Sequence, residues 1–127
     1  MIEFKKIETQ EDFIPYSGDL IGLPTSKNHL NFRWCEPGCK VLFSVTRHGS
    51  GASCHFASDK TGVVKIRQAI NEFVEFVFNS FDWCEMILAL IKYKKVKRWV
   101  RECGFAWTLG FGKRALYIKK REWQEKT

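Results

Sequence analysis

Three side chains in this 127-residue sequence could carry acid–base chemistry. His55 stands in a strand-like segment, residues 52–58, and an imidazole titrates near neutral pH. Glu85 stands near the start of an apolar segment, residues 84–91, where a buried carboxylate would be a stronger base. Tyr93 follows that segment with a hydroxyl that can protonate a leaving group. The same residues also fit structural roles: a core histidine, an exposed charge at a strand end and a packed aromatic ring.

Two further groups of residues could bind an anion. Residues 61–64 connect the segment 52–58 to a strong helical pattern, so their backbone N–H groups could cradle a pyrophosphate at a helix N-terminus. Lys94 and Lys95 fall in the first turn of a later helix, where added cations cost a few tenths of a kcal/mol each. Both turns follow strands that we expect to be parallel, so both should open at one edge of the sheet. The structural alternative is an ordinary turn glycine and lysines that point into solvent.

The segment 84–105 indicates how these groups are positioned. Its first eight residues, 84–91, are too few to cross a bilayer and are typical of a strand that is covered on both faces. The next apolar residues have helical spacing: Val96, Trp99, Val100 and Cys103. We therefore expect these residues against the sheet and the lysines and arginines between them in solvent. Gly104 falls where a left-handed residue ends a helix, and Phe105 should re-enter the core.

The remaining elements alternate between strands and helices. Strands are expected at 2–7, 40–47, 52–58, 105–109 and 115–119, a short helix at 8–12 and a long helix from 61 onward. Turns of two hairpins are expected at 48–51 and 110–112. Residues 18–37, rich in Gly, Pro, Asn and Ser, predict a loop with at most one helical turn. The order β-α-β-β-α-β-α-β-β predicts one α/β domain with a mixed sheet, in which the strands on either side of the long helix run parallel.

The net charge of +7 is unevenly distributed. Basic residues crowd the helix after residue 91 and the C-terminal segment: Lys92, Lys94, Lys95, Lys97, Arg98, Arg101, Lys113, Arg114, Lys119, Lys120 and Arg121. This distribution predicts an anionic partner, which is a phosphorylated cofactor, a nucleic acid or an acidic protein. A solvated basic face that serves solubility is the alternative.

The cysteines and the N-terminus predict a cytoplasmic protein without a membrane partner. Five cysteines lack a disulfide framework, and no segment resembles a signal peptide or a membrane span. Cys35 and Cys39, with His29 and His48 nearby, do not have the spacing of a standard zinc site, so we expect no metal. Phe32 and Trp34 beside Arg33 could stack on bases, but they fit a satellite core better.

The element order, with a Gly-opened central helix and a last helix that ends in Gly-Phe, resembles the GNAT acetyltransferase superfamily. The resemblance covers about the whole chain in element order and is strongest over residues 54–105. There, the stretches CHFASDKTG, NEFVEFVF and RWVRECGF are most like short GNAT-type proteins of tailed bacteriophages. Some of those proteins are described only as acetyltransferases, and one group comprises small internal virion proteins. The resemblance implies a GNAT-like fold, acetyl-CoA as cofactor and an amine as acceptor.

The resemblance also implies site residues, and the sequence departs from the family at several of them. In the pyrophosphate loop, Q/R-x-x-G-x-G/A, only Gly62 matches, with Asp59 and Val64 at the other defining positions. Tyr93 stands where the family commonly has an Asn, and Val100 where it often has the general-acid tyrosine. With the acid–base argument above, the candidate catalytic residues are His55, Glu85 and Tyr93. The candidate cofactor-binding residues are Phe56, Ala57, Ser58, Lys60, Thr61, Gly62, Val63, Val64, Lys94 and Lys95.

Three functions follow from the sequence, and the first is our leading hypothesis. It is a phage-type N-acetyltransferase of the host cytoplasm that transfers acetyl from acetyl-CoA to an amine on a protein, a small molecule or a nucleic acid. The second is a GNAT-fold protein without catalysis that acts by binding, in virion assembly or against a host protein. The third is a basic protein that binds or modifies nucleic acid. A homodimer is compatible with each.

Overall fold

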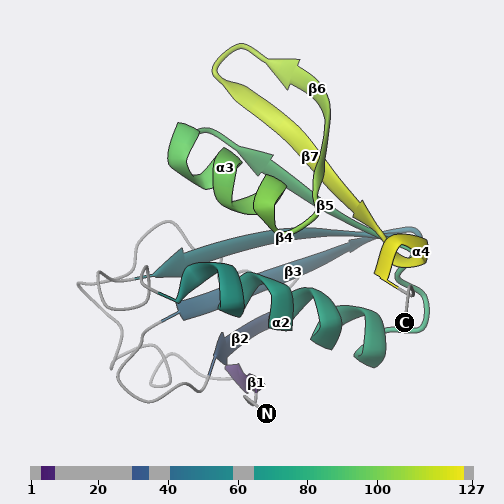
Figure 1. Ribbon diagram of the computed structural model, residues 1–127. Coiled ribbons are helices and arrows are strands. Elements are labelled where there is room, and N and C mark those ends of the chain that lie inside the picture. The colour runs from purple at the N-terminus through teal and green to yellow at the C-terminus, as the bar shows by residue number, and fades with distance from the viewer. Residues whose placement is uncertain (1–3, 8–29, 35–40, 59–64, 125–127) are drawn as a thin grey trace.

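The strands of the protein form one seven-stranded sheet with the order β1-β2-β3-β4-β5-β7-β6 (Figure 1). The computed structural model describes residues 4–7, 30–34, 41–58 and 65–124. The strands are β1 (Phe4–Ile7), β2 (Leu30–Trp34), β3 (Val41–His48), β4 (Gly51–Ser58), β5 (Met86–Ile91), β6 (Ala106–Phe111) and β7 (Arg114–Lys120). The helices are α2 (Ile66–Ser80), α3 (Lys94–Glu102) and α4 (Arg121–Gln124). The predicted mixed α/β fold is confirmed, whereas the short helix expected at 8–12 lies outside the described residues.

The pairing of the strands also follows the prediction. All neighbouring strands are antiparallel except β4 and β5, which are parallel and are connected through α2. The two expected hairpins are present as β3–β4 and β6–β7. None of the helices in the described ranges combines the length and apolarity that a bilayer crossing requires.

The core lies between the sheet and the apolar face of α2. The buried residues of α2 recur at helical spacing: Ile66, Ala69, Ile70, Phe73, Val74, Val77 and Phe78. Phe73 stacks on Phe43 of β3 with ring centroids 4.2 Å apart, which places α2 over the face of β3 that Phe43 occupies. Trp34 of β2 is fully buried, and its indole N–H donates to the Glu72 carboxylate over 3.3 Å. Each large side chain buried in this way contributes about 1.5–3 kcal/mol.

The strand β2 corrects the loop that the sequence predicted over residues 18–37. Leu30, Phe32 and Trp34 alternate with polar residues, and β2 pairs with both β1 and β3. Phe32 is 6% exposed and packs edge-on against Phe76 of α2, with ring centroids 5.0 Å apart. Phe32 and Trp34 are core residues, as expected, but they belong to the main core beneath α2 and not to a satellite core. The strand was not predicted because its alternation of apolar and polar residues is short and lies within a segment whose composition is typical of a loop.

The expectation that 84–91 is covered on both faces is wrong. In β5, Ile87, Ala89 and Ile91 are buried, but Leu90 on the other face is 42% exposed. Ile87 pairs with Ala52 and Ala89 pairs with Tyr117, so the buried residues share the face that α2 and α3 cover. Among the described helices, α2 and α3 pack on this one face, and the opposite face of β5 remains partly open.

The buried face of α3 and its C-terminal end are as predicted from the sequence. Trp99, Val100 and Cys103 are buried, and Val96 packs against the core. Gly104 has φ +92°, the left-handed conformation that favours glycine, and the Phe105 N–H donates to the Val100 carbonyl over 3.0 Å. The basic face is exposed as expected, except that Lys97 is half-buried and donates from Nζ to the Lys113 carbonyl over 3.0 Å.

Candidate functional site

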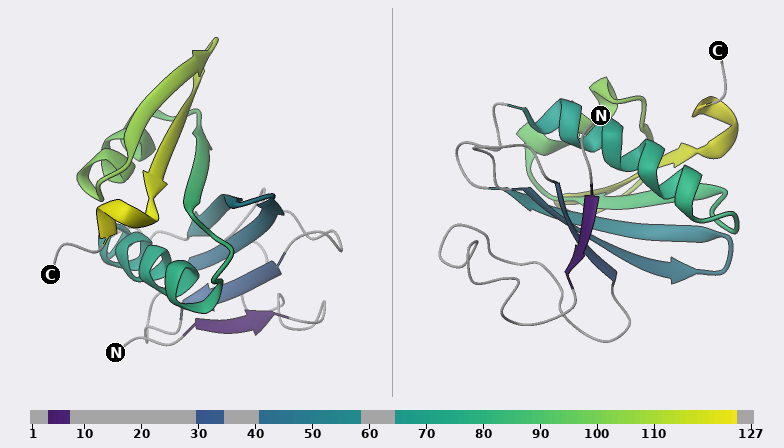
Figure 2. Two further views of the ribbon diagram at one scale, coloured as in Figure 1. Left: turned by 90° about the vertical axis from the view of Figure 1, so that its right-hand side faces the viewer. Right: turned by 90° about the horizontal axis from the view of Figure 1, so that it is seen from below.

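The parallel strands β4 and β5 run together for only a short distance and then diverge. Their register contains three pairs, Gly51 with Met86, Ala52 with Ile87 and Ser53 with Leu88. Beyond Ser53 and Leu88 the strands separate, so β5, β7 and β6 turn away from β1 to β4 (Figures 1 and 2). Both α2 and α3 begin on the side toward which β4 and β5 open (Figure 1). This confirms the expectation that the two helices open at the same edge of the sheet.

The divergence leaves two strand edges facing one another without a partner strand. We call the backbone of Cys54–Ser58 and of Ala89–Ile91 the open edges. Within the described ranges, β4 pairs over this length with β3 alone, and β5 pairs with β7 alone. A strand edge of this kind carries N–H and C=O groups that an extended ligand can satisfy by hydrogen bonding. The open edges are therefore a candidate site for a linear ligand that contains amides.

His55 lies on one of the open edges and is exposed. It pairs across the strands with Ser44, on the face of the sheet opposite α2, because the neighbouring pair Phe43 and Phe56 faces the helix. The same face of β3 carries Ser44 and Thr46, whose buried hydroxyl oxygens have no hydrogen-bond partner among the described residues. His55 therefore stands in a polar row at the point where β4 leaves β5, and the alternative of a core histidine is excluded by its exposure.

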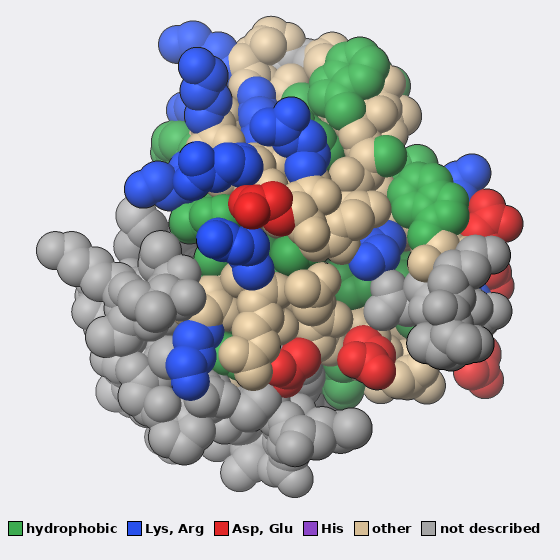
Figure 3. Space-filling view, viewed as in Figure 1, with side chains coloured by type: hydrophobic (Ala, Val, Ile, Leu, Met, Phe, Trp, Pro, Cys, Tyr) green, Lys and Arg blue, Asp and Glu red, His purple; other side chains and the backbone are tan. Residues whose placement is uncertain are grey.

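Tyr93, Lys94 and Lys95 lie at the same end of the molecule as the open edges. Tyr93 is the residue before α3 and is 66% exposed, and the Lys92 ammonium lies 5.7 Å from the centre of its ring. The first turn of α3 has no acidic residue and no side-chain cap, so its backbone N–H groups and both lysines make this terminus positive. Figure 3 shows the lysine and arginine side chains that gather over α3.

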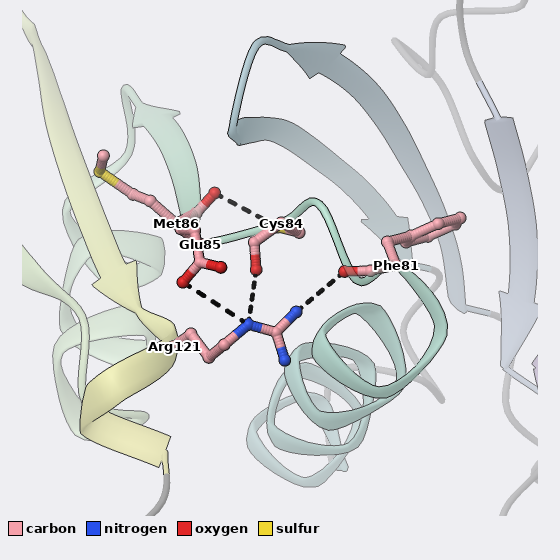
Figure 4. A network of polar contacts seen from close by, with 5 residues as sticks. All are labelled: Phe81, Cys84, Glu85, Met86 and Arg121. Carbon is pink, nitrogen blue, oxygen red and sulfur yellow. Dashed lines mark hydrogen bonds and ion pairs between the residues drawn. The ribbon is translucent and has the colours of Figure 1, made fainter.

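Glu85 lies at the opposite end of β5, and of its two possible roles the structure fits the exposed charge at a strand end. It precedes Met86, the first residue paired with β4, and its side chain is 62% exposed. Its carboxylate oxygen is 3.8 Å from Nε of Arg121 (Figure 4). The structure thus brings His55 and Tyr93 to the open side of the strand pairing and places Glu85 on the closed side.

Arg121 fixes this closed end. Its guanidinium donates to the Cys84 carbonyl and to the Phe81 carbonyl, each over 2.8 Å, and it lies 5.2 Å from the centre of the Phe78 ring (Figure 4). The backbone N–H of Arg121 donates to the Glu85 carbonyl over 2.9 Å. These contacts join the end of α2, the start of β5 and α4. This role of Arg121 was not predicted from the sequence, because its partners are carbonyl groups that are distant in sequence.

The predicted cofactor-binding residues are only partly described. Phe56 is half-buried on the side of α2, and the backbone of Ala57 and Ser58 belongs to an open edge. Lys60, Thr61, Gly62, Val63 and Val64 lie outside the described residues. Val100, at the position of the family's general-acid tyrosine, is 2% exposed in the core, so it has a packing role. The open edge at Ala89–Ile91 was not predicted, because strand divergence leaves no local pattern in the sequence.

The described cysteines are free thiols and fit neither a metal site nor a nucleophile. Burial raises the pKa of the Cys54, Cys84 and Cys103 thiols, which disfavours the reactive thiolate. Within the part of the chain that the structure describes, no three His, Cys, Asp or Glu residues come together as metal ligands. Cys35, Cys39 and His29 lie outside it, and His48 is an exposed residue of the β3–β4 hairpin.

Comparison with known proteins identifies the fold. No protein-family model matches the sequence, and no curated protein is similar to it in sequence. Among solved structures, a mutant of the spermidine N-acetyltransferase SpeG from Vibrio cholerae aligns with a TM-score of 0.74 and 12% identity, over 98% of this chain and 96% of that chain. The N-acetyltransferase PseH from Campylobacter jejuni, in complex with acetyl coenzyme A, aligns with a TM-score of 0.71 and 9% identity, over 95% of this chain and 99% of that chain. The GNAT domain of PAT from S. lividans aligns with a TM-score of 0.63 and 10% identity, over 89% of this chain and 69% of that chain. The chain therefore has the GNAT fold.

Proposed function

We propose that the protein is an N-acetyltransferase that binds acetyl-CoA along the open edges and transfers the acetyl group to an amine. The observation that carries this proposal is the divergence of β4 and β5 after three residue pairs. The pantetheine arm of CoA is a linear chain with two amides, which matches unpaired backbone donors and acceptors on both sides. The structural neighbour PseH was solved with acetyl coenzyme A, which supports the same ligand.

The phosphates of CoA would bind where the two helices begin. Lys94 and Lys95 supply positive charge at the uncapped first turn of α3. Residues 60–64, with Gly62 as the turn glycine, are proposed from the family resemblance to hold the pyrophosphate at the start of α2. Phe56, Ala57 and Ser58 would line the path of the pantetheine arm along β4.

Two exposed side chains are proposed to move protons. Acetyl-CoA supplies an activated acetyl thioester. His55 accepts a proton from the acceptor amine, either directly or through one water, as the C–N bond forms. Tyr93 donates its hydroxyl proton to the sulfur as the C–S bond breaks. It would replace the general-acid tyrosine of the family, because the buried Val100 at that position has no proton to donate. Glu85 is not assigned to the proton transfer, since it lies on the closed side of the strand pairing.

The buried Val100 favours a second candidate function. A GNAT-fold protein that lacks the family's general acid can bind CoA or a protein partner without catalysis. The resemblance of residues 54–105 to short phage proteins supports a phage-type origin, and virion assembly or a host-protein target would be its role. For either candidate we propose the cytoplasm as the compartment, because the described cysteines are free thiols. A homodimer is compatible with both candidates.

Isothermal calorimetry with CoA, together with transfer of a labelled acetyl group, tests the proposal. The acceptor panel should contain spermidine, an aminoglycoside and a peptide with a free N-terminus. We expect CoA to bind and at least one amine to be acetylated at a rate above that of a protein-free control. Binding of CoA without transfer to any amine would favour the second candidate. A folded protein that does not bind CoA would contradict both cofactor and reaction.

A further inference from the structure

The positive charge of the protein comes from one part of the chain. Residues 92–121 contain 11 Lys and Arg and a single acid, Glu102, which gives +10. The rest of the chain then carries 21 − 11 = 10 basic and 14 − 1 = 13 acidic residues, which gives −3. These 30 residues follow β5 and form α3, β6, β7, their connections and the first residue of α4. The charge is therefore polarised toward one half of the sheet, whereas a charge kept only for solubility would need no such bias.

Most of these cations lie on one surface. We call the exposed side chains of Lys92, Lys94, Lys95, Arg98, Arg101 and Lys113 the basic surface. The bond from Lys97 Nζ to the Lys113 carbonyl holds the β6–β7 turn against α3, so the helix and the turn contribute to the same surface. Figure 3 shows lysine and arginine side chains over α3 with little acidic surface between them.

Glu102, the acid of residues 92–121, does not neutralise this surface. Glu102 lies 3.8 Å from Nε of Arg67 and 3.9 Å from Nε of Arg98, so two guanidinium groups share one carboxylate. The first turn of α3 adds the positive end of the helix dipole to Lys94 and Lys95. A ligand with one or two phosphates would engage only part of this surface. The number and spread of the cations fit a polyanion.

An exposed aromatic side chain stands on the same side of the sheet. Trp107 of β6 is 60% exposed and pairs across the strands with Tyr117. Lys119, two residues along β7 from Tyr117, donates to the Cys103 carbonyl at the end of α3 over 2.7 Å, so this face of β7 is the one that α3 covers. Trp107 thus shares the face of α3, at the outer strand of the sheet. Figure 3 shows exposed apolar side chains on the β6–β7 hairpin beside the basic cluster.

We propose that the basic surface and Trp107 form a binding site for single-stranded nucleic acid. The cations contact the phosphates, and the indole of Trp107 stacks on a base. Unpaired bases have free faces for such stacking, and every base offers one, so the site tolerates many sequences. An acidic protein would use the cations but would gain nothing from stacking on Trp107. This binding activity goes beyond acetyl transfer and does not depend on it.

Fluorescence anisotropy with labelled 20-nucleotide single strands of RNA and of DNA tests the site. The test variant combines Arg98→Gln, Arg101→Gln and Lys113→Gln, which leaves the proposed CoA residues unchanged. The matched control combines Arg47→Gln, Lys65→Gln and Lys120→Gln and loses the same net charge elsewhere. We expect the test variant to bind about tenfold or more weakly at 100 mM salt, and its plot of log K against log salt to be shallower by about 2, since each lost phosphate contact removes about 0.7.

The control variant should keep its affinity within about threefold and the parental salt slope. Equal losses in the test and control variants would show a general charge effect and would overturn the proposal. CoA affinity measured by calorimetry should be the same in the parent and the test variant, so failure of CoA binding and failure of nucleic-acid binding are separate results.

A second pair of variants tests the aromatic contact. Trp107→Ala should weaken single-strand binding roughly 5- to 100-fold, while Trp107→Phe, which keeps an aromatic face, should retain most of the affinity. Circular dichroism checks that both variants are folded. Binding of a duplex or of poly-glutamate as tightly as the single strands would contradict the proposal, as would a Trp107→Ala variant with unchanged affinity.

Discussion

The position of His55 on an open edge gives its imidazole a different setting from that of the Glu85 carboxylate, which lies just before β5. His55→Ala should lower kcat by roughly 10²–10⁴-fold, because the amine acceptor loses its general base. CoA affinity should remain nearly unchanged, since the backbone of β4 is retained. Steady-state kinetics with the best acceptor, together with CoA calorimetry, would measure both effects.

Glu85→Gln is the matched control for this variant. It removes a carboxylate that is 62% exposed and lies 3.8 Å from Nε of Arg121, so kcat should stay within about twofold of the parent and stability within about 1 kcal/mol. A His55→Ala enzyme with full turnover, or a Glu85→Gln enzyme with a large loss, would reverse the assignment of the base.

The thiol of Cys84 makes stability depend on pH. Cys84 is fully buried, and burial raises the pKa of its thiol in the folded state. In the unfolded chain the thiol ionises at about pH 8.5, so above that pH the folded state holds more protons than the unfolded state. Stability should therefore be fully present below about pH 8.5 and fall as pH rises. Between pH 7 and pH 10, the free energy of unfolding measured in urea should fall less steeply with pH for Cys84→Ala than for the parent. The same dependence on pH in both proteins would contradict the raised pKa of Cys84.

The packing of α3 depends chiefly on its apolar side. Trp99 is 8% exposed on the sheet side of the helix, so Trp99→Ala should destabilise the protein by about 3–5 kcal/mol. Lys95→Ala, in the exposed first turn, is the control and should change stability by less than about 0.5 kcal/mol. Chemical denaturation would measure both, and a Trp99→Ala variant with parental stability would show that the helix packs differently.

The end of α3 provides a second test at the scale of an element. Gly104 and Gly49 both have positive φ, +92° and +64°. A Cβ at Gly104 would meet Nζ of Lys119 at 2.9 Å, whereas nothing lies within 4 Å of a Cβ at Gly49. Gly49→Ala should therefore cost about 1–2 kcal/mol of backbone strain, and Gly104→Ala about 1 kcal/mol more, because Lys119 loses its bond to the Cys103 carbonyl. If thermal unfolding shows the same loss of stability in both variants, the predicted clash of a Cβ at position 104 with Lys119 would be contradicted.

The elements that the sequence predicted well are those with a long local pattern. The apolar spacing of α2 and α3 and the Gly104 stop could be identified because each is set by residues within a few turns of one another. β2 was missed, although Leu30, Phe32 and Trp34 alternate with Asn31 and Arg33, because five residues within a loop-like composition carry a weak signal. The covering of β5 was also mispredicted, since a continuous apolar run does not reveal how many faces are buried.

At the scale of the whole molecule, the GNAT fold joins two groups of strands through a short contact. Strands β1 to β4 with α2, and strands β5 to β7 with α3, share the three pairs between β4 and β5. The contacts of Cys103 Sγ with the Arg67 carbonyl, at 3.5 Å, and of Glu102 with Arg67 add a link between the helices. The Arg121 contacts reinforce the closed end. Strand divergence results from this long-range arrangement, so the order of elements could be predicted from the sequence but the open edge at Ala89–Ile91 could not.

Because CoA is proposed to bridge the two groups of strands, its binding should stabilise the whole molecule. At 100 times its Kd, CoA should add about 2.7 kcal/mol to the free energy of unfolding, measured by chemical denaturation. Hydrogen exchange read by mass spectrometry should show protection at short exchange times in peptides that contain Cys54–Ser58 and Ala89–Ile91. A peptide that covers β2, which is paired on both sides, should not change. Protection confined to α3 and the β6–β7 turn would place CoA on the basic surface alone and would contradict binding along the open edges.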